Sequence, residues 1–431
     1  MNSAESAALA LVCKERAWSE AQTSDEADLI LLNTCSVRLT AESRVFGRIA
    51  DYSGIKKKRK KPLTIMIAGC MAERLGESLI EKYPQVDYVM GTQARSLFPL
   101  ILEAVEKGEK ANINPDEKPV FSFSGSHLEE GQFRSFIPIM HGCNNFCSYC
   151  IVPYVRGREV SRAPENITEE MCLVAQKGVR EITLLGQNVN SYNWNDVDFS
   201  DLLKIVAQEA KLSGIRWVRF LSANPRNFSS KTIETLALNN CFCRHIHLPV
   251  QHGSNSVLKA MNRGYSRERF LELVNEIRQA MPGITLSTDI LVGFPGETEE
   301  DVKETLGLME EVKFLYSYMY HFNPREGTKA FDLKSRIDED VKKERLSRVI
   351  DLQLKQTARL LEKRIGSTEI VLVEGISRKN ADELITRTEK DEMAAVPGAK
   401  SLIGSFAKVT FSSLNGNTLK AKGAKPLCHG D

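Results

Sequence analysis

Three closely spaced cysteines are the residues of this sequence best suited to carry out chemistry. Cys143, Cys147 and Cys150 form a Cys-x3-Cys-x2-Cys string just after a predicted strand, residues 136–140. Such spacings let one loop bind three corners of a [4Fe–4S] cluster. The fourth iron would then stay open to chelate a small molecule, as catalytic metal sites do. Zinc is the alternative, but zinc usually takes four ligands in paired Cys-x2-Cys form, and no second pair follows nearby.

The composition agrees with this interpretation. Ten cysteines among 431 residues are too few for a disulfide scaffold, so clustered cysteines indicate metal or redox chemistry in a reducing compartment. The sequence contains no apolar run long enough to span a bilayer and no secretory signal at its N-terminus. We therefore expect a cytoplasmic protein with no membrane partner. The net charge of +2 neither demands nor excludes nucleic acid.

The elements that must position these cysteines fall into three regions of an α/β protein. Residues 1–107 alternate helix and strand, which predicts a parallel α/β domain, and 108–132 have the Gly- and Pro-rich composition of a linker. Six β/α units in 133–366 predict a partial (β/α)6 barrel, although periodicity also allows an open sheet. Short strands and a turn signal at Asn415-Gly416 predict a small β-barrel over 367–431.

The ends of the predicted strands provide candidate ligand contacts. In a β/α barrel the loops after the strands form the catalytic face, and polar side chains there suit ligand binding. Asp289 lies within its strand and could instead be a buried structural acid. The barrel strands are expected at 136–140, 181–185, 217–221, 245–250, 285–292 and 315–322. The polar candidates are Gln187, Asn188, Ser222, Gln251 and Asp289.

Longer strings around these residues resemble the radical S-adenosylmethionine methylthiotransferases. The resemblance covers nearly the whole chain, and the last region is similar to a TRAM domain, an RNA-binding module. The string Leu184–Tyr192 is closest to the branch of the family that modifies tRNA. The matching strings are Cys143–Arg162, which has Tyr149 before the third cysteine, Leu184–Tyr192, His247–Gln251 and Thr288–Thr298.

This resemblance implies a specific chemistry. The open iron would hold S-adenosylmethionine, which the strand-end residues and Tyr149 would contact, and cleavage would give a 5′-deoxyadenosyl radical. A second S-adenosylmethionine would methylate a sulfur on another cluster. The methylthio group would then be joined to carbon 2 of isopentenylated adenosine 37, beside the anticodon.

The implied partners are a tRNA anticodon stem-loop and an electron donor such as flavodoxin or ferredoxin. The protein itself is expected to be a monomer. Three other readings stay open. Two are sister enzymes, which modify threonylcarbamoyl-adenosine in tRNA or an aspartate of a ribosomal protein. The third is a tRNA-binding relative without catalytic activity.

Two further cysteines predict the second cluster. Cys35 and Cys70 each follow a predicted strand, so in a parallel sheet both emerge at one edge, although isolated cysteines are more often small buried core residues. By the resemblance, they would hold a second [4Fe–4S] cluster with a third cysteine from a Cys-Gln-Met-Asn string. The chain begins Met1-Asn2, and Cys13 would lie about 15 Å along a helix from the sheet edge. The expectations are a shortened chain, a non-cysteine ligand, or a cluster that does not assemble.

Overall fold

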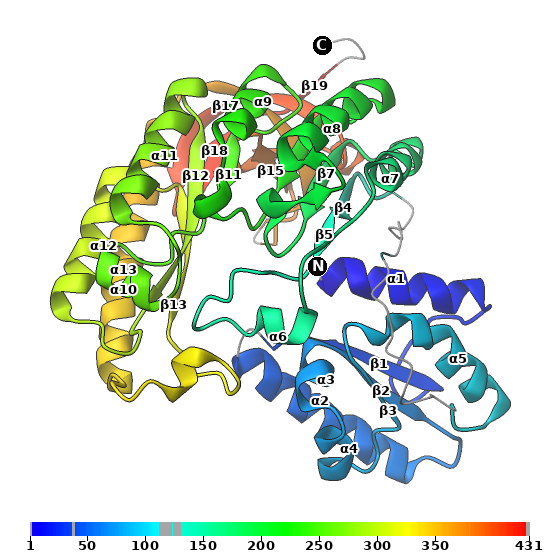
Figure 1. Ribbon diagram of the computed structural model, residues 1–431. Helices are drawn as coiled ribbons and strands as arrows, with labels where there is room; N and C mark the ends of the chain where they lie inside the picture. Colours follow the sequence, from blue (N-terminus) through cyan, green and yellow to red (C-terminus); the bar gives the residue numbers. More distant parts are fainter. Residues whose placement is uncertain (1, 37–38, 112–122, 124–130, 379, 428–431) are drawn as a thin grey trace.

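The computed structural model describes residues 2–36, 39–111, 123, 131–378 and 380–427 of the chain (Figure 1). Most of the predicted linker, residues 112–122 and 124–130, therefore lies outside the described residues. Within the described residues, no helix combines the length and the apolar character needed to cross a membrane.

The N-terminal region is a parallel three-stranded sheet in the order β1-β2-β3, with helices on both faces (Figure 1). Alternate residues of the central strand point to opposite faces, as the strand period requires. Ile65 packs with the helices of one face, and Met66 packs with α1 and α5 on the other. The elements are α1 (Asn2–Glu15), β1 (Leu29–Thr34), α2 (Leu39–Lys58), β2 (Thr64–Gly69), α3 (Cys70–Leu75), α4 (Ser78–Lys82), β3 (Tyr88–Met90) and α5 (Phe98–Lys107).

The middle region is the predicted incomplete barrel, made of two parallel three-stranded sheets in the orders β10-β7-β4 and β11-β12-β13. A parallel bridge between Val218 and Phe242 joins the two sheets. Among the described strands, β4 and β13 are the free edges, so the barrel is open between them. The strands are β4 (Arg134–Pro138), β7 (Glu181–Leu185), β10 (Trp217–Phe220), β11 (His245–His247), β12 (Thr285–Val292) and β13 (Tyr316–His321).

Helices cover the outside of the barrel and pack against its buried strands in one large apolar core (Figure 1). They are α7 (Pro164–Gln176), α8 (Phe199–Ser213), α9 (Ser230–Leu238), α11 (Arg267–Ala280), α12 (Glu299–Val312) and the long α13 (Glu339–Glu362). The short helix α10 (Asn255–Ala260) packs in a separate apolar cluster with Phe294 and Phe322. A short helix, α6 (Val152–Arg156), and the pairs β5 (Met140–His141) with β6 (Val160–Ser161) and β8 (Asn193–Trp194) with β9 (Val197–Asp198) lie in the loops after strands.

Four of the barrel strands have other bounds than expected: β4 begins and ends two residues earlier, and β10, β11 and β13 are shorter. The first divides into β4 and β5, because Met140 and His141 turn away to pair with β6. The strands β10 and β11 end at Phe220 and His247. Directly after the predicted ends at 221 and 250, Ser222 and Gln251 adopt left-handed φ angles of 67° and 73°. The predicted extents were therefore too long by one residue at β10 and by three residues at β11.

The C-terminal region is a small β-barrel, as predicted, closed by pairing of β14 with β17. Its loop at residues 388–391 contacts the starts of the central strands: Tyr316 donates to Asp391 at 2.6 Å, and Thr285 donates to the Lys390 carbonyl at 2.6 Å. It therefore sits at the amino-terminal end of the central barrel, opposite the cysteine loop. Its strands are β14 (Thr368–Ile376), β15 (Glu383–Thr388), β16 (Met393–Pro397), β17 (Phe406–Asn415), β18 (Thr418–Ala421) and β19 (Lys425–Pro426).

Candidate functional site

The three central cysteines lie on one loop, residues 142–158, at the carboxyl end of β4. The β5–β6 pair closes its base, and the Cys143 amide donates to the Gly157 carbonyl at 3.2 Å. Gly142 makes this closure possible, because it has φ +80° and an added Cβ would lie 2.0 Å from the Arg158 carbonyl oxygen. The Cys150 amide donates to the Cys147 carbonyl at 2.9 Å. One locally folded loop therefore presents all three thiols.

The thiols sit in an environment that suits a bound cluster. Burial raises the pKa of Cys143, and burial together with the nearby Cys147 thiol raises the pKa of Cys150 to about 12. A metal must therefore displace the thiol protons. Among the described residues, no three His, Cys, Asp or Glu side chains are arranged around a single metal ion. A cubane cluster does not need such convergence, because each thiolate binds a different iron.

Two residues beyond β11 support the loop from outside. Arg263 is buried, and its Nη1 donates to the Cys147 sulfur at 3.3 Å while its Nη2 donates to the Pro249 carbonyl at 2.9 Å. The Asn262 amide donates to the carbonyls of Asn145 and Phe146 at 3.2 and 3.1 Å. Sequence reasoning missed both residues. They stand more than a hundred positions after the loop, and nothing in the sequence pattern marks them.

The candidate residues after β7 contact the base of the cysteine loop. The Gln187 side-chain oxygen accepts from the Gly142 amide at 2.6 Å. The Asn188 side-chain nitrogen donates to Glu159 at 3.0 Å. The Asn188 oxygen Oδ1 is buried and has no hydrogen-bond partner within the described part of the chain. A buried polar atom without a partner is rare in folded proteins, so this atom is available to a bound ligand.

The candidates on the other half-barrel form a second group. Gln251 and His247 both contact the Asp289 carboxylate, each at 3.5 Å. Asp289 is therefore partly exposed and hydrogen-bonded rather than the deeply buried structural acid that remained possible from sequence. Tyr149, from the cysteine loop, packs near Tyr320 of β13. The left-handed backbone at Ser222 and Gln251 is the kind of strain that concentrates at functional sites.

The two N-terminal cysteines leave the sheet side by side. Residues Thr34 and Gly69 are register partners at the ends of β1 and β2, and Cys35 and Cys70 follow them directly. Gly69 has φ +92°, and an added Cβ would lie 2.5 Å from the Thr34 carbonyl oxygen. Only glycine fits where the chain turns so tightly into α3.

Cys70 is buried against the segment that follows the central cysteines. Ile151 and Val155 pack on it from α6, immediately after Cys150. Burial raises the pKa of Cys70, and the guanidinium of Arg156, which is hydrogen-bonded to the thiol, opposes that shift. The two cysteine sites therefore lie on either side of one short helix. The sequence could not predict this juxtaposition, because it depends on how the two regions pack.

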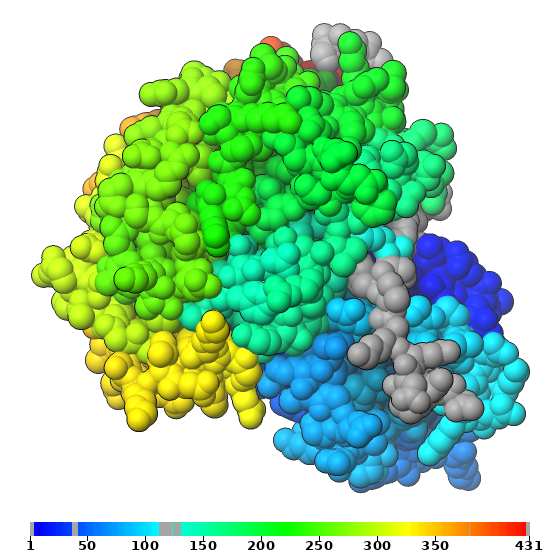
Figure 2. All heavy atoms as spheres, viewed as in Figure 1, coloured from blue at the N-terminus to red at the C-terminus, as the bar shows by residue number. Residues whose placement is uncertain are grey.

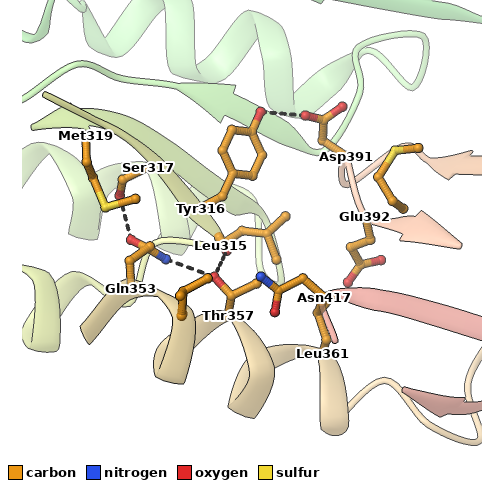
Figure 3. Close-up of a pocket in the computed structure, with 12 residues that line it drawn as sticks. Leu315, Tyr316, Ser317, Met319, Gln353, Thr357, Leu361, Asp391, Glu392 and Asn417 are labelled. Atoms are coloured by element: carbon orange, nitrogen blue, oxygen red, sulfur yellow. Dashed lines mark hydrogen bonds between the residues drawn. The ribbon is translucent and has the colours of Figure 1, made fainter. Parts of the chain in front are cut away.

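A cavity of about 250 Å³ lies at the opposite end of the central barrel, between β13, α13 and the C-terminal barrel (Figure 3). Its polar side chains bond to one another: Ser317 donates to Gln353 at 2.5 Å, and Tyr316 donates to Asp391 at 2.6 Å. The bond between Tyr316 and Asp391 joins the two regions. None of the candidate strand-end residues lines the cavity. The cavity is therefore a feature of the interface between the barrels.

Family models match the three regions in turn. Residues 1–91 match the family described as uncharacterized protein family UPF0004, residues 137–309 match the radical SAM superfamily, and residues 362–422 match the TRAM domain.

Curated relatives match the chain over almost its whole length. A protein of Treponema denticola is 47% identical over 98% of this chain and 97% of its own length. A protein of Bacteroides thetaiotaomicron is 42% identical over 98% of this chain and 93% of its own length. A third, from Natranaerobius thermophilus, is 39% identical over 96% of this chain and 92% of its own. All three are named tRNA-2-methylthio-N(6)-dimethylallyladenosine synthase.

Solved structures agree on the fold. The radical S-adenosylmethionine methyltransferase TsrM from Kitasatospora setae, with cobalamin and a [4Fe–4S] cluster bound, superposes with a TM-score of 0.57 at 14% identity, over 75% of this chain and 70% of that one. The cobalamin-dependent radical enzyme OxsB superposes with a TM-score of 0.51 at 11% identity, over 81% of this chain and 53% of that one. At these identities the likeness concerns the fold alone.

Proposed function

This chain belongs to the tRNA-2-methylthio-N(6)-dimethylallyladenosine synthase family, and from that premise we propose its reaction and the residues that perform it. The reaction converts N6-isopentenyladenosine at position 37 of tRNA to its 2-methylthio derivative by radical S-adenosylmethionine chemistry.

The observation that carries the proposal is the short distance in the fold between two cysteine sites. Ile151 and Val155, which follow Cys150 directly, cover Cys70. Attachment of a methylthio group needs both a radical and a sulfur donor within reach of one carbon atom. Proximity and orientation of that kind account for much of the rate of a reaction between two bound groups.

In this proposal each site holds one [4Fe–4S] cluster. Cys143, Cys147 and Cys150 bind the cluster whose open iron takes S-adenosylmethionine, and Cys35 and Cys70 bind the other. When bound, the first cluster would supply the electron for cleavage of S-adenosylmethionine, and the second would supply the sulfur.

The residues at the strand ends then hold S-adenosylmethionine. Gln187 fixes the base of the loop, and the free Oδ1 of Asn188 accepts a hydrogen bond from the ligand. The remaining contacts in the proposal are Tyr149, Ser222, Gln251 and Asp289.

The C-terminal region, residues 367–431, docks the anticodon stem-loop, since small β-barrels bind nucleic acid through a strand face and loops. Residues 1–107 form the domain of the second cluster and 133–366 the radical domain, separated by the linker 108–132. The working enzyme is a cytoplasmic monomer that receives electrons from a flavodoxin or ferredoxin.

The test combines an iron count with product analysis. Anaerobic reconstitution should give about eight irons per chain, four for each cluster. Mass spectrometry of nucleosides from an unmodified, isopentenylated tRNA should then show the 2-methylthio product only when the protein, S-adenosylmethionine and a reductant are all present.

Two outcomes would contradict the proposal. About four irons per chain, with tRNA binding but no product, would favour the tRNA-binding relative without catalytic activity. Formation of 5′-deoxyadenosine without a methylthio product would mean that the second cysteine site does not supply sulfur.

A further inference from the structure

The segment that follows β13, residues 322–332, contacts both cysteine sites. Within it, the Ala330 amide donates to the carbonyl of Ser148, which lies between Cys147 and Tyr149. Arg325 reaches the N-terminal region, where its Nη1 donates to Glu42 of α2 at 3.3 Å. Figure 2 shows this segment, in yellow, lying against the blue N-terminal region. A single short segment of the barrel therefore touches the central loop at one end and helix α2 of the N-terminal region at the other.

Arg325 ends in a buried cluster of charges next to Cys35. The Glu42 carboxylate lies between two guanidiniums, because Arg74 also donates to it, at 2.9 Å. Arg74 further donates to the hydroxyl of Ser36, the residue after Cys35, at 3.4 Å. Two cations and one anion leave this cluster with a surplus positive charge. Cys35 is close enough for its charge to act on the Arg325 guanidinium.

One nitrogen of Arg325 has no partner. Its side chain is 8% exposed, and its Nη2 is buried without a hydrogen-bond acceptor within the described residues. A guanidinium is planar and carries five N–H donors in fixed directions. The hydrogen bond from Nη1 to Glu42 therefore also fixes the direction in which Nη2 points. A buried donor of this kind rarely lacks a hydrogen-bond acceptor in a folded protein. Among the described residues this donor is unused, so it is available to a bound group.

We propose that Arg325 is a further positioning residue of the N-terminal cysteine site, and that its Nη2 donates a hydrogen bond to an anionic sulfur atom bound beside Cys35. The inference rests on the proposed function, which places a cluster at Cys35 and Cys70. A sulfide or thiolate sulfur is an anionic acceptor, and a charge-assisted bond from a guanidinium to it is stronger than a neutral one. Donors around a cluster also orient its ligands and raise its reduction potential.

The test isolates the N-terminal site in the full-length chain. Replacing Cys143, Cys147 and Cys150 with alanine leaves only the N-terminal cluster after reconstitution. In this background Arg325→Gln should shift the midpoint potential, measured by an EPR-monitored redox titration, to a more negative value. It should also weaken binding of methanethiolate, followed by the change in the EPR signal, by roughly 10- to 100-fold.

Two further variants separate a specific role from a structural one. Arg325→Lys keeps the charge without the planar fork, so it should recover part of the potential and little of the methanethiolate affinity. Arg345→Gln is the matched control. Arg345, on α13, is also a buried arginine, and it donates a hydrogen bond to Glu297 at 2.9 Å. The control variant should leave both quantities unchanged.

The inference is overturned if Arg325→Gln has the same potential and methanethiolate affinity as its parent, or shifts them no more than Arg345→Gln. It is also overturned if the parent holds no iron once the central cysteines are removed. Failure of the proposed function is a separate result, because it is read from the tRNA product of the unaltered protein.

Discussion

The two cysteine sites are built in different ways. The central site is local: three cysteines stand on one loop of residues 142–158, and a glycine and a two-residue ladder close that loop. The N-terminal site is assembled from distant parts of the chain. Cys35 and Cys70 come from two strands, Arg156 and the apolar cover of Cys70 come from α6, and Arg325 comes from the loop after β13.

Because of this difference, the two sites depend on different parts of the fold. A site held within one loop keeps its shape as long as that loop is closed. A site shared between two regions exists only while those regions stay packed together, so ion pairs across the boundary become part of its chemistry. The predictions below separate these two dependencies.

The largest effect is expected from the central loop. Cys147→Ala should abolish formation of 5′-deoxyadenosine, measured by liquid chromatography, and lower the iron content by about four per chain, because a cubane cluster needs its thiolate ligands. Cys172→Ala, on the partly exposed surface of α7, is the control and should change neither quantity. Retention of 5′-deoxyadenosine formation in Cys147→Ala would contradict the assignment of this loop.

A selective loss is expected from the other site. Cys70→Ala should also remove about four irons per chain but should keep cleavage of S-adenosylmethionine while losing the methylthio product. The measurement is 5′-deoxyadenosine and modified nucleoside from the same reaction. Loss of both products would mean that the two sites are not separable in this way.

Packing between the regions should be sensitive to Glu42. Glu42→Gln removes the carboxylate between Arg74 and Arg325 and leaves one buried and one partly buried cation without compensation. Breaking a buried pair in this way costs about 4 kcal/mol. Hydrogen exchange should show faster opening of α2 and α3, with the central loop unaffected. Glu103→Gln is the control, because Glu103 pairs with Lys107 on an exposed surface, so this change should leave stability nearly unaltered.

Acid should weaken the same boundary. Burial of Glu5 opposes its ionisation, but the guanidiniums of Arg156 and Arg95 outweigh burial and lower the pKa of Glu5 from 4.5 to about 2. Because the folded pKa is the lower one, this stabilisation is complete above pH 4.5 and is lost as the pH falls from about 4.5 to about 2. The total is about 3 kcal/mol.

The measurement is the unfolding free energy of the metal-free protein between about pH 5 and pH 2.5. Glu5→Gln should flatten this dependence. If the unfolding free energy depends on pH equally in the variant and the unaltered protein, then Glu5 does not hold α1 to α6.

The smallest effect is expected from local support of the central loop. Asn262→Gly removes the bonds to Asn145 and Phe146 and keeps the left-handed backbone, since Asn262 has φ +58°. A hydrogen bond of this type contributes about 1 kcal/mol, so iron should leave the central cluster roughly five times faster in the presence of a chelator. Iron in the N-terminal cluster should leave at an unchanged rate, and faster loss from both would argue against purely local support.

The same contrast explains what the sequence could predict. The order of helices and strands was confirmed in all three regions, because apolar periodicity is a local signal. The central cysteines were predicted as a site from their spacing, which is also a local signal. The ends of β10 and β11 were predicted at 221 and 250, directly before the left-handed residues Ser222 and Gln251, whereas the strands end one and three residues earlier.

Residues that act across regions stayed hidden. Arg263 meets Cys147 across 116 positions, and Arg325 meets Glu42 across 283. A lone arginine in a sequence looks the same whether it faces solvent or a buried carboxylate. Nothing in the sequence pattern connects Arg156 with Cys70, and their contact follows from the packing of α6.

The open side of the central barrel has a mechanical consequence. Since β4 and β13 do not pair among the described strands, the barrel has a lateral seam as well as a mouth, and the cysteine loop and the loop after β13 stand at one end of that seam. No backbone ladder ties the two sides of the seam together, so they can separate without the loss of any strand-to-strand hydrogen bond. The contacts of the loop after β13 with the cysteine loop and with α2 therefore take the place of a closing ladder at that end.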